Sequence, residues 1–294
     1  MLAPVTEIFC DIDDFCKLYF KQQSIYLLPN PERNRDRESQ MSISEIMTIL
    51  VLFHMSHYRT LKDFYIECVL GDMKNCFPTA HSYSRFVACE HSVLTALLAY
   101  LFSRAGNKTG LYFIDSTTLR ICHNKRIYRN KVFKGLAERG KTTMGWFFGF
   151  KLHLVINHKG ELVSFCLTKG NVDDRAVVRH LTKGLTGIMG GDKGYIDNKM
   201  TTELDARELR FVTKVRKNMK KKMLSAFERF FLSQRGIIET IIDQLKNLYQ
   251  IDHSRHRSPI NFLVNLIGGL VAYTYRPNKP GIKGIQPANL LCEF

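Results

Sequence analysis

The first hundred residues place apolar side chains at the spacing of amphipathic helices. Residues 5–22 carry one apolar stripe, and Ser42-x-x-Glu45 is a capping box that opens a helix over residues 43–55. Thr60 can cap a third helix, and a fourth helical stretch reaches residue 103. We therefore predict a helical N-terminal domain over residues 1–105. Two helices joined by a short basic turn fit a DNA-reading helix-turn-helix and a plain packing domain equally well.

From residue 111 onward the pattern changes to that of strands. Runs rich in aliphatic and aromatic residues predict five strands, over residues 111–115, 146–156, 161–168, 188–192 and 211–215. Helical spacing predicts helices near residues 173–181, 198–208 and 236–249. A long polar loop is expected over residues 123–145. The alternation predicts an α/β domain over residues 106–275, followed by a C-terminal tail over residues 276–294.

Two of these strands run into a carboxylate, at Asp115 and at Asp192. A buried carboxylate needs a compensating cation, hydrogen-bond donors or a metal, because its desolvation costs several kcal/mol. Glycines on both sides of Asp192 suit a close approach by backbone or ligand. If the two strands are neighbours, both acids lie at one edge of the sheet. The alternative for Asp115 is a strand-end aspartate that caps the following turn.

The helix over residues 236–249 offers a third acid. Arg235, Glu239, Asp243 and Lys246 follow one helical stripe, so their side chains share a face. Taken alone, such a stripe is more often a solvated row of ion pairs. If Glu239 joins the two aspartates, the site has only oxygen ligands, which favour Mg²⁺ or Mn²⁺.

Composition narrows the class of partner. The 294 residues include 43 Lys+Arg against 27 Asp+Glu, a formal charge of +16. A surplus of this size indicates a polyanion, and clustering of the cations favours nucleic acid over an anionic membrane surface. The eight cysteines are scattered and form no Cys-x-x-Cys pair, which is typical of a reducing compartment. We find no signal peptide, and the apolar run over residues 260–273 is too short to span a bilayer. We therefore expect a cytoplasmic protein with no membrane partner.

Two clusters of basic residues are candidate DNA contacts. The loop over residues 123–145 contains Lys125, Arg126, Arg129, Lys131, Lys134, Arg139 and Lys141. The second cluster follows the last predicted strand and contains Lys214, Arg216, Lys217, Lys220, Lys221 and Lys222. Both clusters suit the DNA backbone, and the alternative is a solvated surface. Asp173 and Asp174 are expected to be helix caps, and His153 is expected to be structural.

These motifs together resemble the DDE transposases of bacterial insertion sequences, most closely the insertion-sequence 982 family. The resemblance rests on Ile114-Asp115-Ser116-Thr117, on Gly191-Asp192-Lys193-Gly194-Tyr195 and on Arg235-x3-Glu239-x6-Lys246. Supporting stretches lie at residues 131–137, 145–153 and 170–175. Related transposases often carry Tyr three residues before the arginine, where this chain has Leu232.

The resemblance implies a ribonuclease-H-like mixed sheet with Asp115, Asp192 and Glu239 as a catalytic metal triad for Mg²⁺ or Mn²⁺. Arg235 and Lys246 would hold phosphates beside it, with Lys125, Arg126, Arg129, Lys131, Lys134, Lys141, Lys217, Lys220 and Lys221 along the DNA. The implied partners are double-stranded terminal inverted repeats and target DNA, bound by a homodimer in the bacterial cytoplasm at the nucleoid. The implied reaction is cleavage at the element ends and strand transfer. A nuclease of the same fold without strand transfer and an inactive DNA-binding copy are the alternatives.

Overall fold

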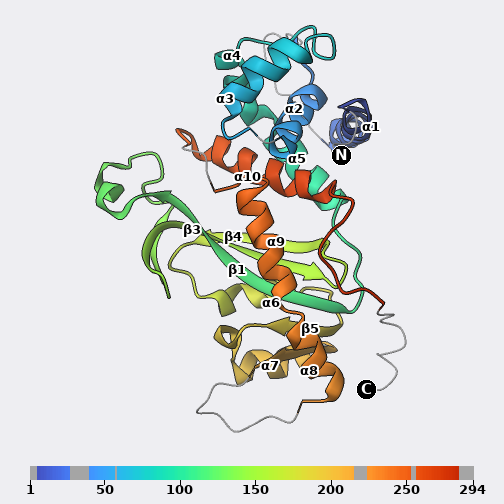
Figure 1. Cartoon of the computed structure of the whole chain (residues 1–294), viewed down its shortest axis with the longest axis vertical. Helices are drawn as coiled ribbons and strands as arrows, with labels where there is room; N and C mark the ends of the chain where they lie inside the picture. Colours follow the sequence, from blue (N-terminus) through green and yellow to red (C-terminus); the bar gives the residue numbers. More distant parts are fainter. Residues whose placement is uncertain (1–4, 27–39, 57, 215–223, 253–255, 285–294) are drawn as a thin grey trace. The chain divides into compact units, whose positions relative to one another are not determined.

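The computed structural model describes the whole chain except residues 1–4, 27–39, 57, 215–223, 253–255 and 285–294 (Figure 1). The chain forms two compact units. The helical unit contains residues 1–104 and 245–276, and the sheet unit contains residues 105–244 and 277–294. The sequence had placed residues 245–275 with the catalytic domain, whereas the structure groups them with the N-terminal helices.

The helical unit consists of helices only, among its described residues. Its elements are α1 (Val5–Tyr26), α2 (Ile43–Met55), α3 (Leu61–Phe64), the π-helix η1 (Tyr65–Asp72), α4 (Tyr83–Cys89), the 3-10 helix η2 (Glu90–Val93), α5 (Leu94–Ser103) and α10 (Pro259–Thr274). The predicted capping box is present, because Ser42 accepts from the Glu45 amide while Glu45 accepts from the Ser42 amide. Thr60 caps α3 as expected.

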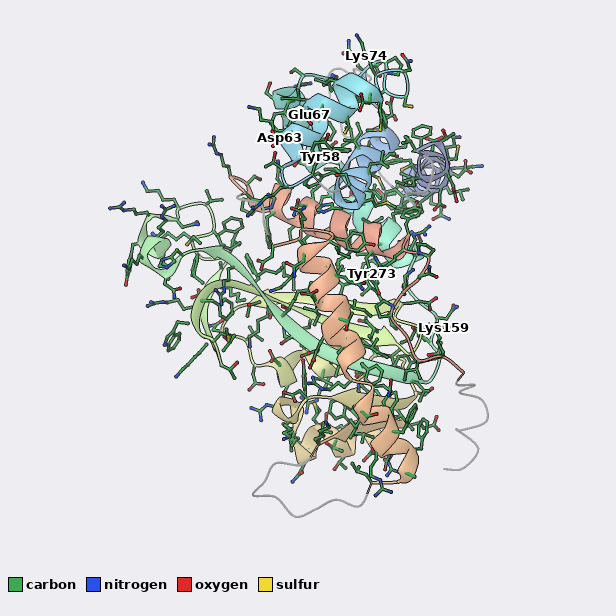
Figure 2. All side chains as sticks on the ribbon, viewed as in Figure 1. Tyr58, Asp63, Glu67, Lys74, Lys159 and Tyr273 are labelled. Atoms are coloured by element: carbon green, nitrogen blue, oxygen red, sulfur yellow. The ribbon has the colours of Figure 1, made fainter. Side chains whose placement is uncertain are left out.

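Helix α10 joins this unit because it packs against α2 and α5. A Cβ on Gly268 would lie 3.2 Å from Cδ2 of His54, so the two helices approach closely at this glycine. The buried His54 ring also lies 2.6 Å from the Tyr249 carbonyl oxygen, and burial lowers the pKa of His54 to about 4. Tyr273 on α10 is fully buried, whereas Tyr58 reaches Glu67 at the surface with a 2.8 Å hydrogen bond (Figure 2).

The stretch Tyr83–Ser103, which runs through α4, η2 and α5, is long and apolar enough to cross a membrane by length and composition alone. Core helices of water-soluble proteins meet the same criteria, and this stretch contains Arg85 and the buried Glu90. We infer no membrane contact from it.

The sheet unit is built on a six-stranded mixed sheet. Its strands are β1 (Leu111–Cys122), β2 (Glu138–Thr142), β3 (Gly145–Asn157), β4 (Leu162–Lys169), β5 (Gly187–Gly191) and β6 (Leu209–Thr213). Its helices are η3 (Asn124–Arg129), η4 (Asp174–Val177), α6 (Val178–Leu181), η5 (Lys193–Tyr195), α7 (Asn198–Asp205), α8 (Ala226–Ser233) and α9 (Gly236–Asn247), the last of which ends in the helical unit.

The strand order is β2-β3-β1-β5-β6, with β4 also paired to β3. Strands β1 to β4 pair antiparallel, while β1, β5 and β6 are parallel neighbours. This mixed order is the ribonuclease-H-like arrangement that the sequence predicted. The expected hairpin between β3 and β4 is present, and its turn uses Gly160 at φ 76°, a conformation that favours glycine.

Three expectations about elements need correction. Strand β1 is twelve residues long, so Asp115 lies inside the strand and not at its end. The predicted loop over residues 123–145 contains η3 and β2. The sequence pattern missed β2 because this strand is polar and pairs with β3 at the sheet edge. Helix α8 was not expected, although the sequence carries its capping box, Ser225-x-x-Glu228.

Both faces of the sheet are covered. On one face Tyr112 and Ile114 of β1 pack in a core with residues of α6 and α7. On the other face Phe113 stacks on Phe231 of α8, with ring centroids 4.4 Å apart. Because side chains alternate along a strand, Asp115 lies on the α8 face and Ser116 on the α6 and α7 face.

The buried Glu90 makes the helical unit sensitive to pH. Its side chain is 4% exposed, its Oε1 has no hydrogen-bond partner in the described chain, and burial raises the pKa of Glu90 to about 8. The folded state therefore holds a proton that the unfolded chain releases near pH 4.5. The contribution of Glu90 to the free energy of unfolding is therefore greatest below pH 4.5 and is lost as the pH rises through 8.

We predict that Glu90→Gln raises the melting temperature at pH 9 and has little effect at pH 4. Gln fills the same space without a charge to desolvate, and the difference at high pH should be on the order of a few kcal/mol. Thermal unfolding across this pH range measures it, with the exposed Glu7→Gln as the control. A difference that does not change with pH would contradict the assignment.

Candidate active site

Asp115 and Asp192 occupy matching positions on neighbouring parallel strands. The last β1–β5 pair is Phe113 with Gly190, and the same register continued two residues further brings Asp115 opposite Asp192. Strand β5 ends at Gly191, which leaves Asp192 just beyond its carboxyl end. The two carboxylates are near each other, because the pKa of Asp115 is raised by burial and further by the negative charge of Asp192.

The residues around Asp192 keep its carboxylate available. Asp192 begins η5, but its side chain makes no capping hydrogen bond. A Cβ on Gly191 would lie 2.7 Å from Cζ of Phe211, so this glycine serves the packing of the core and not the approach of a ligand. Gly194 has open space around it.

Glu239 is connected to Asp115 through Arg235. The Arg235 guanidinium pairs with the Glu239 carboxylate, and its Nη1 lies 3.7 Å from Oδ2 of Asp115. Helix α9 begins at Gly236, so Arg235 and Glu239 lie one turn apart at its start. The ion pair expected along the stripe is present, and it extends across to strand β1.

The pKa of Asp115 is raised to about 6. Burial is the main cause, and the negative charges of Asp192 and Glu239 add to it, while the Ser116 amide and Arg235 oppose it. Asp192 and Glu239 are therefore both near enough to Asp115 to disfavour its ionised form. Arg235 compensates only part of this charge.

The donor chemistry of this cluster fits a divalent cation. Three carboxylates supply only oxygen ligands, and a buried acid repelled by two others is stabilised by added positive charge. Within the described residues no group of three or more His, Cys, Asp or Glu side chains already surrounds one point. Arg235 lies between two of the acids, and Glu239 is paired with it.

A second polar cluster lies behind Asp115, on the opposite face of the sheet. Asp174 accepts hydrogen bonds from Lys151 Nζ at 2.9 Å and from Ser116 Oγ at 3.1 Å. Only Asp173 acts as the expected cap, since its carboxylate accepts from the Arg175 amide. The expectation that Asp174 is also a cap is wrong, because its side chain turns to the sheet.

Two further buried side chains complete this cluster. His153 Nε2 lies 2.9 Å from Thr168 Oγ1, its Nδ1 is 4.0 Å from Asp174, and burial lowers its pKa to about 4. The Tyr195 hydroxyl is buried without a hydrogen-bond partner in the described chain, and burial raises the pKa of Tyr195. His153 is structural, as expected, and it belongs to the polar support of β1.

The sequence contained a signal for this cluster. Lys151 and His153 are polar residues two apart in an otherwise apolar strand, so they lie on one face, opposite Thr118 and Ser116 of β1. Polar residues on the core side of a strand require partners there. Asp174 is the partner that sequence reasoning missed.

The remaining predicted residues lie elsewhere. Lys246 belongs to the helical unit and pairs with Asp252 at 3.3 Å. Leu232, in the position of the usual tyrosine, is buried on α8. Lys217, Lys220 and Lys221 lie outside the described residues, so the second basic cluster stays a prediction.

The first basic cluster forms a projecting arm, which we define as residues 123–146. It contains η3, β2 and the start of β3, and it extends from the green end of β1 in Figure 1. Its cations are exposed and, in this described segment, form no ion pair with a carboxylate; they are Lys125, Arg126, Arg129, Lys131, Lys134, Arg139 and Lys141. The structure thus gathers the predicted basic residues on one basic arm.

We predict that Asp174→Asn lowers the free energy of unfolding by about 1–3 kcal/mol, because it leaves the half-buried Lys151 ammonium without its counter-charge. Its neighbour gives a matched control: Asp173→Asn keeps a side-chain oxygen for the cap and removes only an exposed ion pair with Arg175, at about 1 kcal/mol or less. Urea unfolding of both variants measures the difference. If both variants lose the same free energy of unfolding, Asp174 does not stabilise the sheet through Lys151.

Comparison with known proteins is consistent with this geometry. The family described as Transposase DDE domain matches residues 105–259, more than half of the chain. No curated protein sequence matches significantly. Among solved structures, the chain is similar to the piggyBac transposase synaptic complex with hairpin DNA, at 12% identity and TM-score 0.48, over 98% of this chain and 76% of that one.

The Mos1 strand transfer complex is a more distant likeness, at 9% identity and TM-score 0.23, over 90% of this chain and 87% of the other. The family match covers both aspartates, the glutamate and the basic arm. The chain therefore belongs to the transposase DDE domain family, whose members act in DNA transposition.

Proposed function

We propose that this protein cuts DNA at the ends of a bacterial insertion sequence of the 982 family and joins them to target DNA, with Mg²⁺ or Mn²⁺ held by Asp115, Asp192 and Glu239. One observation carries the proposal: Asp115, Asp192 and the Arg235–Glu239 pair meet at the edge where β5 ends. This edge lies inside the region matched by the transposase family.

The bound cation would activate a water molecule or a DNA 3′-hydroxyl and stabilise the leaving 3′-oxygen of the scissile phosphate. The chain's own residues have separate tasks. Asp115 is held in place by the Ser116 amide, and its raised pKa reflects a carboxylate that gains from a nearby cation. Arg235 has a planar guanidinium that suits a phosphate oxygen as well as a carboxylate.

The basic arm supplies the DNA contacts of this proposal. Its seven cations lie on a segment that leaves the sheet from the strand carrying Asp115. DNA that enters the site would pass along it, with phosphates neutralised by lysine and arginine. Lys246, Lys217, Lys220 and Lys221 are proposed as further phosphate contacts on the basis of the sequence.

The proposal includes an assembly and a place of action. Two element ends are processed together, so we expect a homodimer on double-stranded terminal repeats, acting on target DNA in the bacterial cytoplasm. Inverted repeats flanking the gene would support this assignment.

We predict that Asp115→Asn, Asp192→Asn and Glu239→Gln each abolish cleavage of a plasmid that carries the gene with its flanking sequences. Each variant removes one ligand, while folding and DNA binding persist because the charge repulsion decreases. Chelator should abolish cleavage by the wild type, and Mg²⁺ should restore it. Gel analysis of cut and joined products measures both steps.

Asp243→Asn is the matched control, since Asp243 is an exposed acid one turn further along α9. It should keep cleavage near the wild-type level. Cleavage by Asp192→Asn, or by the wild type in excess chelator, would refute the triad. If the DNA is cut but no joined products form, the protein is a nuclease without strand transfer. If the protein binds DNA but does not cut it, the protein is an inactive DNA-binding copy.

We predict that replacing Lys131, Lys134 and Lys141 together with Ala lowers affinity for all duplex sequences about equally. Each phosphate contact contributes about −0.9 to the slope of log affinity against log salt, so the slope should flatten by up to roughly three units. Preference for the element ends should survive, because phosphate contacts position the protein without reading sequence. Binding measured across a salt series tests this.

A second triple variant removes the same charge from elsewhere in the sheet unit. Lys159, Lys183 and Lys199 are exposed and lie outside the basic arm, and Lys159 is at the β3–β4 turn (Figure 2). Their replacement with Ala should leave the slope unchanged. Equal slopes for both triple variants would remove the arm from the DNA path, and a loss confined to the terminal repeats would make it a base reader.

A further inference from the structure

Trp146, the only tryptophan of the chain, is exposed on the basic arm. It lies near the start of β3 with 56% of its side chain accessible. Met144 and Tyr128, from the same arm, are 85% and 92% exposed. Large apolar side chains gathered on an exposed surface indicate a contact with another molecule.

The hairpin that carries Trp146 has a defined backbone. The Trp146 carbonyl accepts a 2.8 Å hydrogen bond from the Asn124 side chain, which ties η3 to the hairpin. The Thr142 hydroxyl donates to the Gly145 carbonyl and accepts from the Met144 amide, which closes the tip. Lys141 is the direct cross-strand neighbour of Trp146, and Lys141 Nζ lies 5.7 Å from the ring centroid. The ring is thus presented to solvent from a fixed backbone position, with a cation beside it.

The charge around the ring indicates what that partner is. Residues 123–146 contain seven lysines and arginines and one acid, Glu138. A second copy that docked through its own basic arm would bring seven more cations to this surface and be repelled. An aromatic ring among cations is instead the composition of a surface that binds nucleic acid by stacking on bases while cations meet the phosphates.

We propose that Trp146 stacks on an unpaired nucleobase of the DNA, with Lys141 beside it for the adjoining phosphate. The inference rests on the proposed function in taking DNA as the substrate, and it adds a subsite that duplex contacts do not require. Base faces are hidden in an intact duplex, so this subsite selects single-stranded, frayed or extruded nucleotides.

The single tryptophan makes the contact directly measurable, because all tryptophan emission comes from this position. We expect oligothymidylate to quench the emission of the full-length protein, and a fully paired duplex bound to the same extent to quench it far less. The titration is run in chelator, where no cleavage takes place. Asp115→Asn should give the same quenching, since it leaves the arm intact.

Variants test the contribution of the ring to affinity, measured by the anisotropy of a labelled oligonucleotide. Trp146→Ala should weaken binding of oligothymidylate about 5- to 150-fold, the range for loss of one stacked base. Trp146→Phe should stay within about 3-fold of the wild type, because it keeps a stacking face. Phe230→Ala, which removes an exposed aromatic ring from α8, should leave affinity unchanged.

Each outcome decides a separate point. Unchanged emission with bound oligothymidylate, or equal affinity of Trp146→Ala and wild type, overturns the stacking subsite. Self-association of DNA-free protein that is lost in Trp146→Ala also overturns it, in favour of a second copy of the chain. If oligothymidylate quenches the emission but the protein does not cleave DNA in Mg²⁺, the stacking subsite is supported and the proposed function is refuted. If the protein cleaves DNA but the emission is not quenched, the proposed function is supported and the stacking subsite is refuted.

Discussion

Repulsion of the buried Asp115 carboxylate by Asp192 and Glu239 is the constraint on which the candidate site depends. Burial alone disfavours a charged Asp115, and Asp192 and Glu239 make its ionisation harder still. A folded chain accepts this cost only where something compensates it. In this structure Arg235 provides part of the compensation by contacting Asp115 and Glu239 together. The cluster is thus held in a state that favours any additional positive charge, whether a cation or a guanidinium.

Support for this arrangement comes from the far side of strand β1. Asp115 faces α8 and α9, while the next residue, Ser116, faces a polar cluster anchored by Asp174 and Lys151. One strand therefore carries the Asp115 carboxylate on one face and the anchor of the strand on the other. Fixing β1 there matters because β5 no longer pairs with it beyond Phe113.

The sequence predicted which helices and strands form better than it predicted their lengths. It likewise identified the charged residues better than it identified their partners. Apolar runs identified five strands, and the capping box of α2 was found from Ser42 and Glu45, because these signals are local. The length of β1 was underestimated because polar residues follow Asp115, and only pairing with β3 keeps them extended. Asp174 was assigned to a cap because its true partners, Lys151 and Ser116, are distant in sequence. The meeting of Arg235 with Asp115 likewise depends on tertiary contact, which no local pattern specifies.

The partial pairing of β1 has a consequence for solubility. Among the described strands, β1 has a neighbour on its β5 side only as far as Phe113, so its second half is an open edge. Open edges can pair with strands of other molecules and promote aggregation. Here the edge is interrupted by an irregular register between Arg120 and Cys122, and Arg120 adds a charge to it. The irregular register and the charge of Arg120 thus both oppose extension of the sheet by a foreign strand.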